Sequence, residues 1–468
     1  MDKELLAKID KLIEEDRAEL AKDVIKLVNI KSTRGEPKPG MPWGEGPRKV
    51  LDTVLQMGKE RGFYGKDYGV GVISLALNDS EPDVGVFAHG DVVPEGDGWI
   101  YEPYNATEYK GCIIGRGATD NKGQLVSILH LLSIFKKLGI KLKYNPALYV
   151  GSNEETGMED MIGIPGNPDA RGFVNVCKCP RVSLVPDGGF PVGYGGKGKV
   201  TIDIIANEPV SGFTIEGGHD EAPGKAEALF DRTDIGEVPT CTVEKGAKTK
   251  VWTQTPPRHS AHPDPNGNMI TVLTKAIIDN GLCSEKDAKK LDFIRKVSCD
   301  TEGNIFDISR KGGVTGDTVV ATISIKTVDG KPCFTLGIRY PIELTYDEMV
   351  ANIEKVAAEN GFSVYHINRG VDPYLLDVNW EVIQKLNAVS NEVTGSDSKP
   401  YTVGGGTYAH RLPNALVYGM NGCLPPEGFP EGHGSAHGRD ELVSLDRLQR
   451  AMRIFARAFL TLDEIENW

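Results

Sequence analysis

Apolar residues recur at helical spacing in several parts of the chain. Over the first thirty residues, leucine, isoleucine and valine return every three or four positions, which predicts two helices or one bent helix. The same spacing predicts a helix over 124–138, ended by Gly139, and another over 378–393, ended by Gly395. A last amphipathic helix is expected to begin near Ser444.

Three short apolar runs, 84–88, 147–150 and 182–185, show no alternation of apolar and polar residues. Such runs are typical of strands that are buried on both faces of a sheet. The helix predicted over 124–138 lies between the first two runs, and the order strand, helix, strand favours a mostly parallel sheet. The sequence therefore predicts an α/β fold in which helices flank the sheet.

The pattern changes near residue 191, where apolar and polar residues begin to alternate. Alternating strands are expected near 319–326 and 333–340, and helical patterns cover about 270–295 and 347–360. This middle section predicts an α+β domain of residues 191–375, inserted between 1–190 and 376–468 of the first domain.

The charge pattern excludes some partners. The formal net charge is −13 and there is no basic stripe, which argues against nucleic acid and anionic membranes. Eight cysteines without a CxxC pair favour a reducing compartment. No signal-peptide core and no run of 18 apolar residues occurs, so we expect a soluble, cytoplasmic protein.

Reactive polar residues follow directly after the three apolar runs. These segments are His89-Gly90-Asp91, Gly151-Ser152-Asn153-Glu154-Glu155 and Pro186-Asp187, and two more, 115–123 (GRGATDNKG) and 437–441 (HGRDE), precede predicted helices. Because ligands gather at the carboxyl ends of parallel strands, all five are candidates for one site. Imidazole and carboxylate donors without thiolate suit Zn, Mn or Co and indicate a two-metal hydrolytic centre.

Simpler interpretations of the single motifs stay open at this point. A lone His-Gly-Asp turn is often structural, and adjacent glutamates in a loop are usually solvated. The GRGATDNKG turn does not match a phosphate-binding loop, because glycine follows Lys122. His130 and His366 are expected to be structural, whereas His433 competes with His437 as a ligand.

The five segments, in this order, resemble the motifs of the co-catalytic zinc metallopeptidases of the aminoacylase and carnosinase superfamily. The matching stretches are HGDVVPEGDGW, GRGATDNKG, GSNEETG, VPDGGFPV and HGRDE. The chain most resembles the dipeptidase V branch (PepV, the Xaa-His dipeptidases) of a superfamily that also contains succinyl-diaminopimelate desuccinylases. The resemblance implies that 1–190 and 376–468 form the catalytic metal-binding domain and that 191–375 is a lid that binds substrate.

The resemblance also implies roles for individual residues. The implied metal ligands are His89, Asp120, Glu155, Asp187 and His437, with Asp120 bridging two ions. Asp91 would orient His89, and Glu154 would be the general base that activates a metal-bridged water. A cis peptide bond between Asp120 and Asn121 is implied as well.

Three further matches concern the substrate. His262, in Ser260-Ala261-His262, is similar to a family histidine that stabilises the oxyanion. Arg339, in the GIRYP stretch 337–341, matches an arginine that grips the C-terminal carboxylate of the substrate. Gly405 and Gly406 belong to a GGGTYA loop that lines the substrate pocket with backbone amides.

The resemblance implies a metal-dependent dipeptidase that hydrolyses unblocked dipeptides. Two divalent ions are implied as cofactors, with zinc favoured over manganese and cobalt. The alternative enzyme is an N-acyl-amino-acid deacylase or desuccinylase that uses the same centre. A catalytically decayed binding protein is disfavoured, because a pure binding site would not need the base Glu154. We expect a monomer, with a dimer as the alternative.

Overall fold

The structure of the protein is a computed structural model that describes residues 2–164, 167, 170–218, 224–255, 263–264, 267–420 and 424–466. The chain forms two compact units. Unit 1 consists of Met1–Gly195, Leu376–Val403 and Thr407–Trp468, and unit 2 consists of Gly196–Leu375 and Gly404–Gly406.

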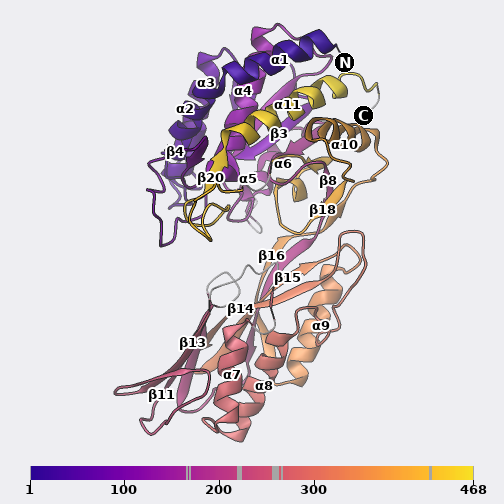
Figure 1. Ribbon diagram of the computed structural model, residues 1–468. Coiled ribbons are helices and arrows are strands. Elements are labelled where there is room, and N and C mark those ends of the chain that lie inside the picture. The colour runs from indigo at the N-terminus through magenta and orange to yellow at the C-terminus, as the bar shows by residue number, and fades with distance from the viewer. Residues whose placement is uncertain are drawn as a thin grey trace. The chain divides into compact units, whose positions relative to one another are not determined.

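The main sheet of unit 1 has the strand order β1-β2-β6-β3-β7-β19-β8, and β18 pairs with β8 (Figure 1). The strands are β1 (Tyr64–Asp67), β2 (Ile73–Ala76), β3 (Val84–His89), β6 (Pro146–Gly151), β7 (Val182–Val185), β8 (Gly193–Gly196), β18 (Tyr401–Val403) and β19 (Ala415–Val417). The central strands β6, β3, β7 and β19 are parallel, whereas β1, β2 and β8 run antiparallel to their neighbours. Every residue of β3, β6 and β7 is buried, as the unalternating apolar runs predict. The α/β fold class is therefore confirmed.

The helices of unit 1 confirm most of the helical patterns in the sequence. They are α1 (Lys3–Glu15), α2 (Arg17–Val28), α3 (Glu45–Glu60), α4 (Gly123–Lys137), α5 (Glu159–Ile162), α6 (Phe173–Val176), α10 (Glu381–Thr394) and α11 (Leu445–Leu462), with the short turns η1 (Ala118–Lys122) and η2 (Tyr408–His410). The N-terminal pattern forms two helices that meet at Asp16. A small sheet of order β20-β5-β4 joins Leu442–Ser444, Cys112–Ile114 and Thr107–Tyr109.

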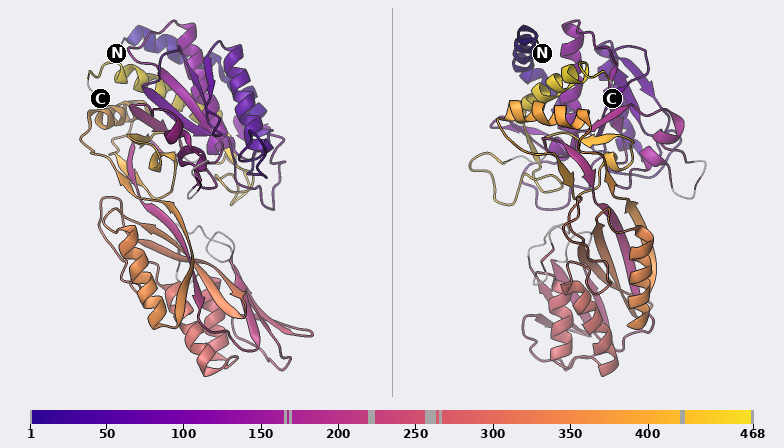
Figure 2. Two further views of the ribbon diagram at one scale, coloured as in Figure 1. Left: turned by 180° about the vertical axis from the view of Figure 1, so that it is seen from behind. Right: turned by 90° about the vertical axis from the view of Figure 1, so that its right-hand side faces the viewer.

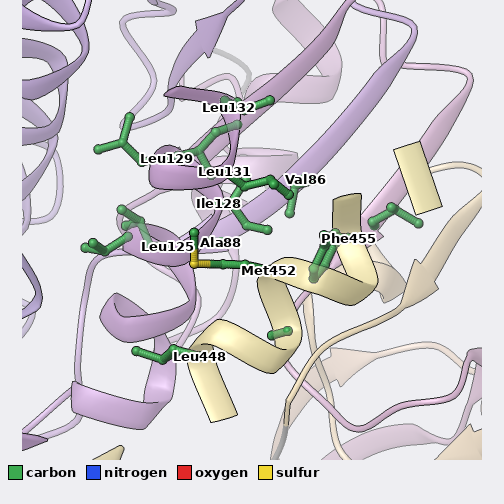
Figure 3. Packing of buried hydrophobic residues seen from close by; sticks show 14 of the residues in the cluster. Val86, Ala88, Leu125, Ile128, Leu129, Leu131, Leu132, Leu448, Met452 and Phe455 are labelled. Carbon is green, nitrogen blue, oxygen red and sulfur yellow. The ribbon is translucent and has the colours of Figure 1, made fainter. Parts of the chain in front are cut away.

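The core of unit 1 lies between the parallel strands and the helices α1, α4 and α11, which pack against one another (Figures 1 and 2). Figure 3 shows Ile128 of α4 beside Val86 of β3, with Met452 and Phe455 of α11 close by. Helix α4 is buried on nearly all sides, so it fixes the position of the η1 turn that immediately precedes it.

Unit 2 contains an antiparallel sheet of order β12-β13-β11-β10-β14-β15-β9-β16. Its strands are β9 (Gly198–Ala206), β10 (Phe213–Gly217), β11 (Lys225–Phe230), β12 (Thr242–Lys245), β13 (Thr249–Gln254), β14 (Val319–Val328), β15 (Lys331–Tyr340) and β16 (Phe362–Val371). The short strand β17 (Tyr374–Leu375) is not part of this sheet. Its helices are α7 (Met269–Asp279), α8 (Glu285–Cys299) and α9 (Tyr346–Glu359). Apolar residues of the sheet and the helices form a separate core.

One helix prediction in unit 2 is wrong, because the pattern over 270–295 forms two helices rather than one. Helix α7 ends before Asn280, and Gly281 adopts a left-handed φ of +62°, which favours glycine. Ser284 then begins α8 by accepting a hydrogen bond from the N–H of Asp287. Among the residues described above, no helix combines the length and apolarity that a membrane crossing needs.

Candidate metal centre

The parallel strands of unit 1 bring three of the predicted segments to one edge of the sheet. β3 ends at His89, which lies opposite Gly151 at the end of β6, and β7 ends at Val185 on the other side of β3. Asp187 follows β7, and Glu154 and Glu155 follow β6. This placement is the one expected for ligands of a site at the carboxyl ends of parallel strands.

The five predicted ligands form two overlapping groups. Potential ligand atoms of His89, Asp120 and Asp187 lie within 4.8 Å of one another, and so do those of Asp120, Glu155 and His437. Asp120 belongs to both groups: its Oδ1 lies 3.0 Å from Nε2 of His89, and its Oδ2 lies 3.1 Å from Nε2 of His437. His437 Nε2 is also 3.2 Å from Oε1 of Glu155. The two carboxylate oxygens of Asp120 thus face two different histidines.

The donor set and its surroundings fit divalent metal ions. The Nδ1 of His89 donates a hydrogen bond to the main-chain oxygen of Asp91 at 3.0 Å, which orients the ring with Nε2 toward the carboxylates. Glu154 is buried beside the two groups, and its Oε1 has no hydrogen-bond partner among the described residues. A buried cluster with more carboxylates than cationic partners is stabilised by bound cations.

The pKa values of the cluster reflect burial and crowding of charge. Burial, reinforced by the negative charge of Asp187, raises the pKa of Glu154 well above its usual range. Burial, with the nearby charge of Asp120, raises the pKa of Asp187 to about 7. Hydrogen bonds with Asp120 and Glu155 raise the pKa of His437 to about 11. Without a cation, the cluster therefore holds protons that a cation would replace.

Asp120 is positioned by the η1 turn, which a second buried carboxylate holds. Glu441 accepts hydrogen bonds from the N–H groups of Gly117 at 2.9 Å and of Thr119 and Asp120 at 3.0 Å. Gly117 has a φ of +84°, a conformation that favours glycine. The peptide bond between Asp120 and Asn121 is cis, as the resemblance implies.

Arg116 joins this turn to the segment that carries His437. The Arg116 side chain is buried and donates to Oε2 of Glu441 at 2.8 Å and to the main-chain oxygen of His437 at 3.1 Å. Sequence reasoning assigned no role to Arg116 or Glu441. Both lie inside the quoted motifs, but nothing in the sequence indicates that they meet each other.

Asp91 has more contacts than its predicted role requires. Its side-chain oxygens accept hydrogen bonds from the N–H groups of Glu154 and Glu155, both at 3.1 Å. Its Oδ1 is 3.5 Å from Nδ1 of His89, farther away than its own main-chain oxygen. The carboxylate of Asp91 therefore holds the Glu154-Glu155 loop, while its carbonyl orients His89.

His433, which the sequence offers as a competing ligand, lies outside both groups, and so do His130 and His366. His433 hydrogen-bonds to Asp440, and His130 lies between Asp16 and Asp23. His366 is an exposed residue of β16 in unit 2.

The predicted substrate residues are placed in part. Arg339 on β15 is buried and donates to the main-chain oxygen of Gly404 at 2.6 Å, and both residues belong to unit 2. Gly405 is exposed and Gly406 half-buried. His262 lies outside the described residues.

Comparisons with known proteins show the family to which the chain belongs. The profile of "Peptidase family M20/M25/M40" matches residues 85–461. "Putative dipeptidase SH1171" of Staphylococcus haemolyticus is 25% identical over 486 residues, covering 96% of this chain and 98% of the relative. A "Putative dipeptidase" of Staphylococcus aureus strain USA300 is 24% identical and covers 95% of this chain and 97% of the relative.

Two solved structures share the fold. Human carnosine dipeptidase 1 is 15% identical, with a TM-score of 0.59, and the match covers 98% of this chain and 99% of that one. The dipeptidase Dug1p of Saccharomyces cerevisiae is 14% identical, with a TM-score of 0.59, and covers 99% of both chains.

Clustered histidines and carboxylates at the strand ends of an α/β fold suit a metal-dependent hydrolase, and the family match shows that the chain is a metallopeptidase. The chain belongs to peptidase family M20/M25/M40. The metallopeptidases of this family use divalent metal ions, and the two groups around Asp120 are the candidate sites for such ions.

Proposed function

We propose that the protein is a metal-dependent dipeptidase that hydrolyses unblocked dipeptides. The observation that carries the proposal is the position of Asp120, whose two carboxylate oxygens face His89 and His437, beside the buried Glu154. The curated relatives named as dipeptidases, which this chain matches almost from end to end, support the substrate class. Within the family, the order of the five motifs and the residues in them support the dipeptidase V branch.

In this proposal two ions are held by the two groups of residues. His89, Asp120 and Asp187 would hold one, and Asp120, Glu155 and His437 would hold the other. Nitrogen and oxygen donors without thiolate accept Zn, Mn or Co, and we favour zinc. Bound divalent ions would supply Lewis-acid chemistry, which acidifies a water molecule and polarises a carbonyl.

Glu154 is proposed as the general base and then the general acid. Its carboxylate would take one proton from the attacking water and return it to the leaving amine, so the side chain ends the reaction unprotonated. Burial raises the pKa of Glu154 in the absence of a cation, and bound cations would favour its carboxylate form, which is the form that takes a proton. The amide N–H groups of Glu154 and Glu155 are fixed by Asp91, which places the base beside the ligands.

Substrate recognition is proposed to involve the segment 191–375 as a lid. Arg339 would hold the C-terminal carboxylate of the dipeptide, since its guanidinium can donate two parallel hydrogen bonds. The backbone amides of Gly405 and Gly406 would line the pocket, and His262 would stabilise the oxyanion. We also propose a cytoplasmic monomer, with a dimer as the alternative, and light scattering of the purified protein distinguishes the two.

The experiment compares two substrate classes with the metal-loaded protein. Ala-Ala-type dipeptides are expected to be hydrolysed, while N-acetyl and N-succinyl amino acids are not. The reverse preference would favour the N-acyl-amino-acid deacylase, which uses the same centre but rejects a free amine. Binding of either class without hydrolysis would contradict both enzymes.

A further inference from the structure

A buried carboxylate outside both groups of predicted ligands holds the loop that leads to Glu154. Asp160 lies on α5, and its side chain is buried. Its Oδ2 accepts hydrogen bonds from the N–H groups of Ser152 at 2.8 Å and Asn153 at 3.1 Å. These two residues directly precede Glu154, so Asp160 fixes the backbone from which the base projects.

The third donor to Asp160 comes from a distant part of the chain. The phenol of Tyr408 donates to the same Oδ2 at 2.5 Å, and the Tyr408 side chain is fully buried. The ring of Tyr408 also lies edge-to-face against the ring of His89, with the centroids 6.4 Å apart. Tyr408 therefore contacts both a predicted ligand and the carboxylate that holds the base loop.

Gly151 provides the space for this pair of side chains. A Cβ atom on Gly151 would lie 2.0 Å from the phenol oxygen of Tyr408 and 2.5 Å from Oδ2 of Asp160. Such distances exclude any side chain at the end of β6. The contact between Asp160 and Tyr408 therefore explains sterically why the residue before Ser152 is a glycine.

The carboxylate of Glu154 depends on its backbone for its position. Its Oε1 has no hydrogen-bond partner among the described residues, whereas the backbone amides of Asn153 and Glu154 are bound by Asp160 and Asp91. A misplacement of about 1 Å at a reacting group lowers the rate about 100-fold. Small changes in this loop should therefore reduce turnover without changing substrate affinity.

We propose that Asp160 and Tyr408 are positioning residues that fix Glu154 for proton transfer. This inference rests on the proposed function of the centre. Tyr408 also follows Gly406 by only two positions, so its hydrogen bond connects the chain segment of the proposed substrate glycines to the loop of the base.

The test begins with Tyr408→Phe, which keeps the ring beside His89 and removes only the phenol oxygen. We expect kcat for an Ala-Ala-type dipeptide to fall about tenfold, with KM and bound metal per chain unchanged. The matched control is Tyr144→Phe, since Tyr144 is also buried and donates to the main-chain oxygen of Phe459 at 2.7 Å. Tyr144 lies two residues before the first residue of β6, whereas Gly151 is the last residue of that strand. The control should lose thermal stability but keep kcat.

Two variants of Asp160 separate its hydrogen bonds from its charge. Asp160→Asn keeps one oxygen for the same three donors and should retain most of kcat, whereas Asp160→Ala should lose it. Amide hydrogen exchange of the peptide 151–157, measured by mass spectrometry, provides a readout that does not need activity. Exchange should be faster in Tyr408→Phe than in the wild type and unchanged in Tyr144→Phe.

The outcomes distinguish this inference from the proposed function. Equal kcat and equal exchange in the wild type and Tyr408→Phe would overturn the positioning role while the proposed function stands. An equal loss of kcat in Tyr144→Phe would assign the effect to general stability and would also overturn it. If the wild type hydrolyses none of the dipeptides or N-acyl amino acids, the proposed function fails, and with it the kinetic role.

Discussion

The side chain of Asp91 accepts a hydrogen bond from the backbone N–H of Glu154, with Oδ1 and N separated by 3.1 Å. The other carboxylate oxygen accepts from the N–H of Glu155 at the same distance. A residue predicted to orient His89 therefore also positions the proposed base and one proposed ligand. One buried carboxylate links the ends of β3 and β6 at the candidate centre.

This link predicts the effect of Asp91→Asn. The amide nitrogen of asparagine would face the N–H of Glu154 or Glu155, donor against donor, and the loop would shift. We expect kcat to fall about 10- to 100-fold, the range found when residues that support a metal site are replaced. Steady-state kinetics measure kcat, and elemental analysis measures the bound metal per chain. Asp97→Asn, an exposed position in the segment that follows Asp91, should leave kcat and bound metal unchanged. A wild-type kcat in Asp91→Asn would contradict the link.

The base is tested by Glu154→Gln, which keeps the size of the side chain and removes its ability to take a proton. Bound metal per chain, measured by elemental analysis, should stay the same while kcat falls about 100- to 10,000-fold. Glu102→Gln, at an exposed position, is the control. Hydrolysis at an undiminished rate would remove Glu154 from the mechanism.

Metal removal should lower the thermal stability of the protein. Burial and mutual repulsion raise the pKa values of Glu154, Glu155 and Asp187, so the cluster is unfavourable without a cation. A ligand at 100 times its Kd stabilises the folded state by about 2.7 kcal/mol. Calorimetry should therefore show a lower Tm after chelation, restored by adding back Zn, Mn or Co. Asp120→Asn should lose most of this response, and a Tm that ignores chelation would argue against bound ions.

The buried strands of the main sheet, and the polar residues at their carboxyl ends, can be predicted from the sequence for a physical reason. Strands buried on both faces need apolar side chains at every position, so β3, β6 and β7 appear as uninterrupted runs. The polar residue after each run marks the strand end, and parallel pairing then brings these ends together. The sequence thus predicts His89 and Asp187 at one edge of the sheet, whereas the pairing of β3 with β7, which brings them together, comes from the structure.

The residues that support the centre could not be found in the same way. Asp160 and Tyr408 are 248 positions apart, and a buried carboxylate has the same letter in the sequence as a solvated one. The break between α7 and α8 was missed for a related reason, since apolar spacing continues across it and only Gly281 and Ser284 mark the turn. Side-chain hydrogen bonds between distant segments depend on tertiary structure, which periodicity does not encode.

The carboxylate-binding role of Arg339 predicts a change in KM. Arg339→Ala should raise KM for dipeptides about 10- to 100-fold, because a charge-assisted, two-pronged hydrogen bond is lost. Arg339→Lys should recover only part of the affinity, since lysine lacks the planar fork. Arg369→Ala is the control, as Arg369 lies on the same sheet and pairs with Asp372 at an exposed site. An unchanged KM in Arg339→Ala would place the substrate carboxylate elsewhere.

His130 forms a buried ionic cluster away from the candidate centre. Its Nδ1 donates to Asp16 at 2.6 Å and its Nε2 to Asp23 at 2.9 Å, and Asp23 also binds Arg61. Burial alone would lower the pKa of His130, but the hydrogen bonds with Asp16 and Asp23 outweigh it and raise the pKa. For Asp23 the balance runs the other way: burial would raise its pKa, and the contacts with His130 and Arg61 lower it.

These shifts predict how His130→Gln changes stability with pH. A raised pKa means that the folded state binds the proton more tightly, so the contribution of His130 is complete below its unfolded pKa of about 6.5 and is lost as pH rises through the folded pKa. Because the pKa of Asp23 is lowered in the folded state, the contribution of Asp23 to the free energy of unfolding is fully present above about pH 4. Between pH 5 and 6 the variant should therefore be about 2 kcal/mol less stable than the wild type. Thermal unfolding should show that the difference in stability between His130→Gln and the wild type becomes smaller at alkaline pH. The control His366→Gln, at an exposed position, should be about as stable as the wild type. A gap that widens as the pH rises would mean that His130 is neutral in the folded protein.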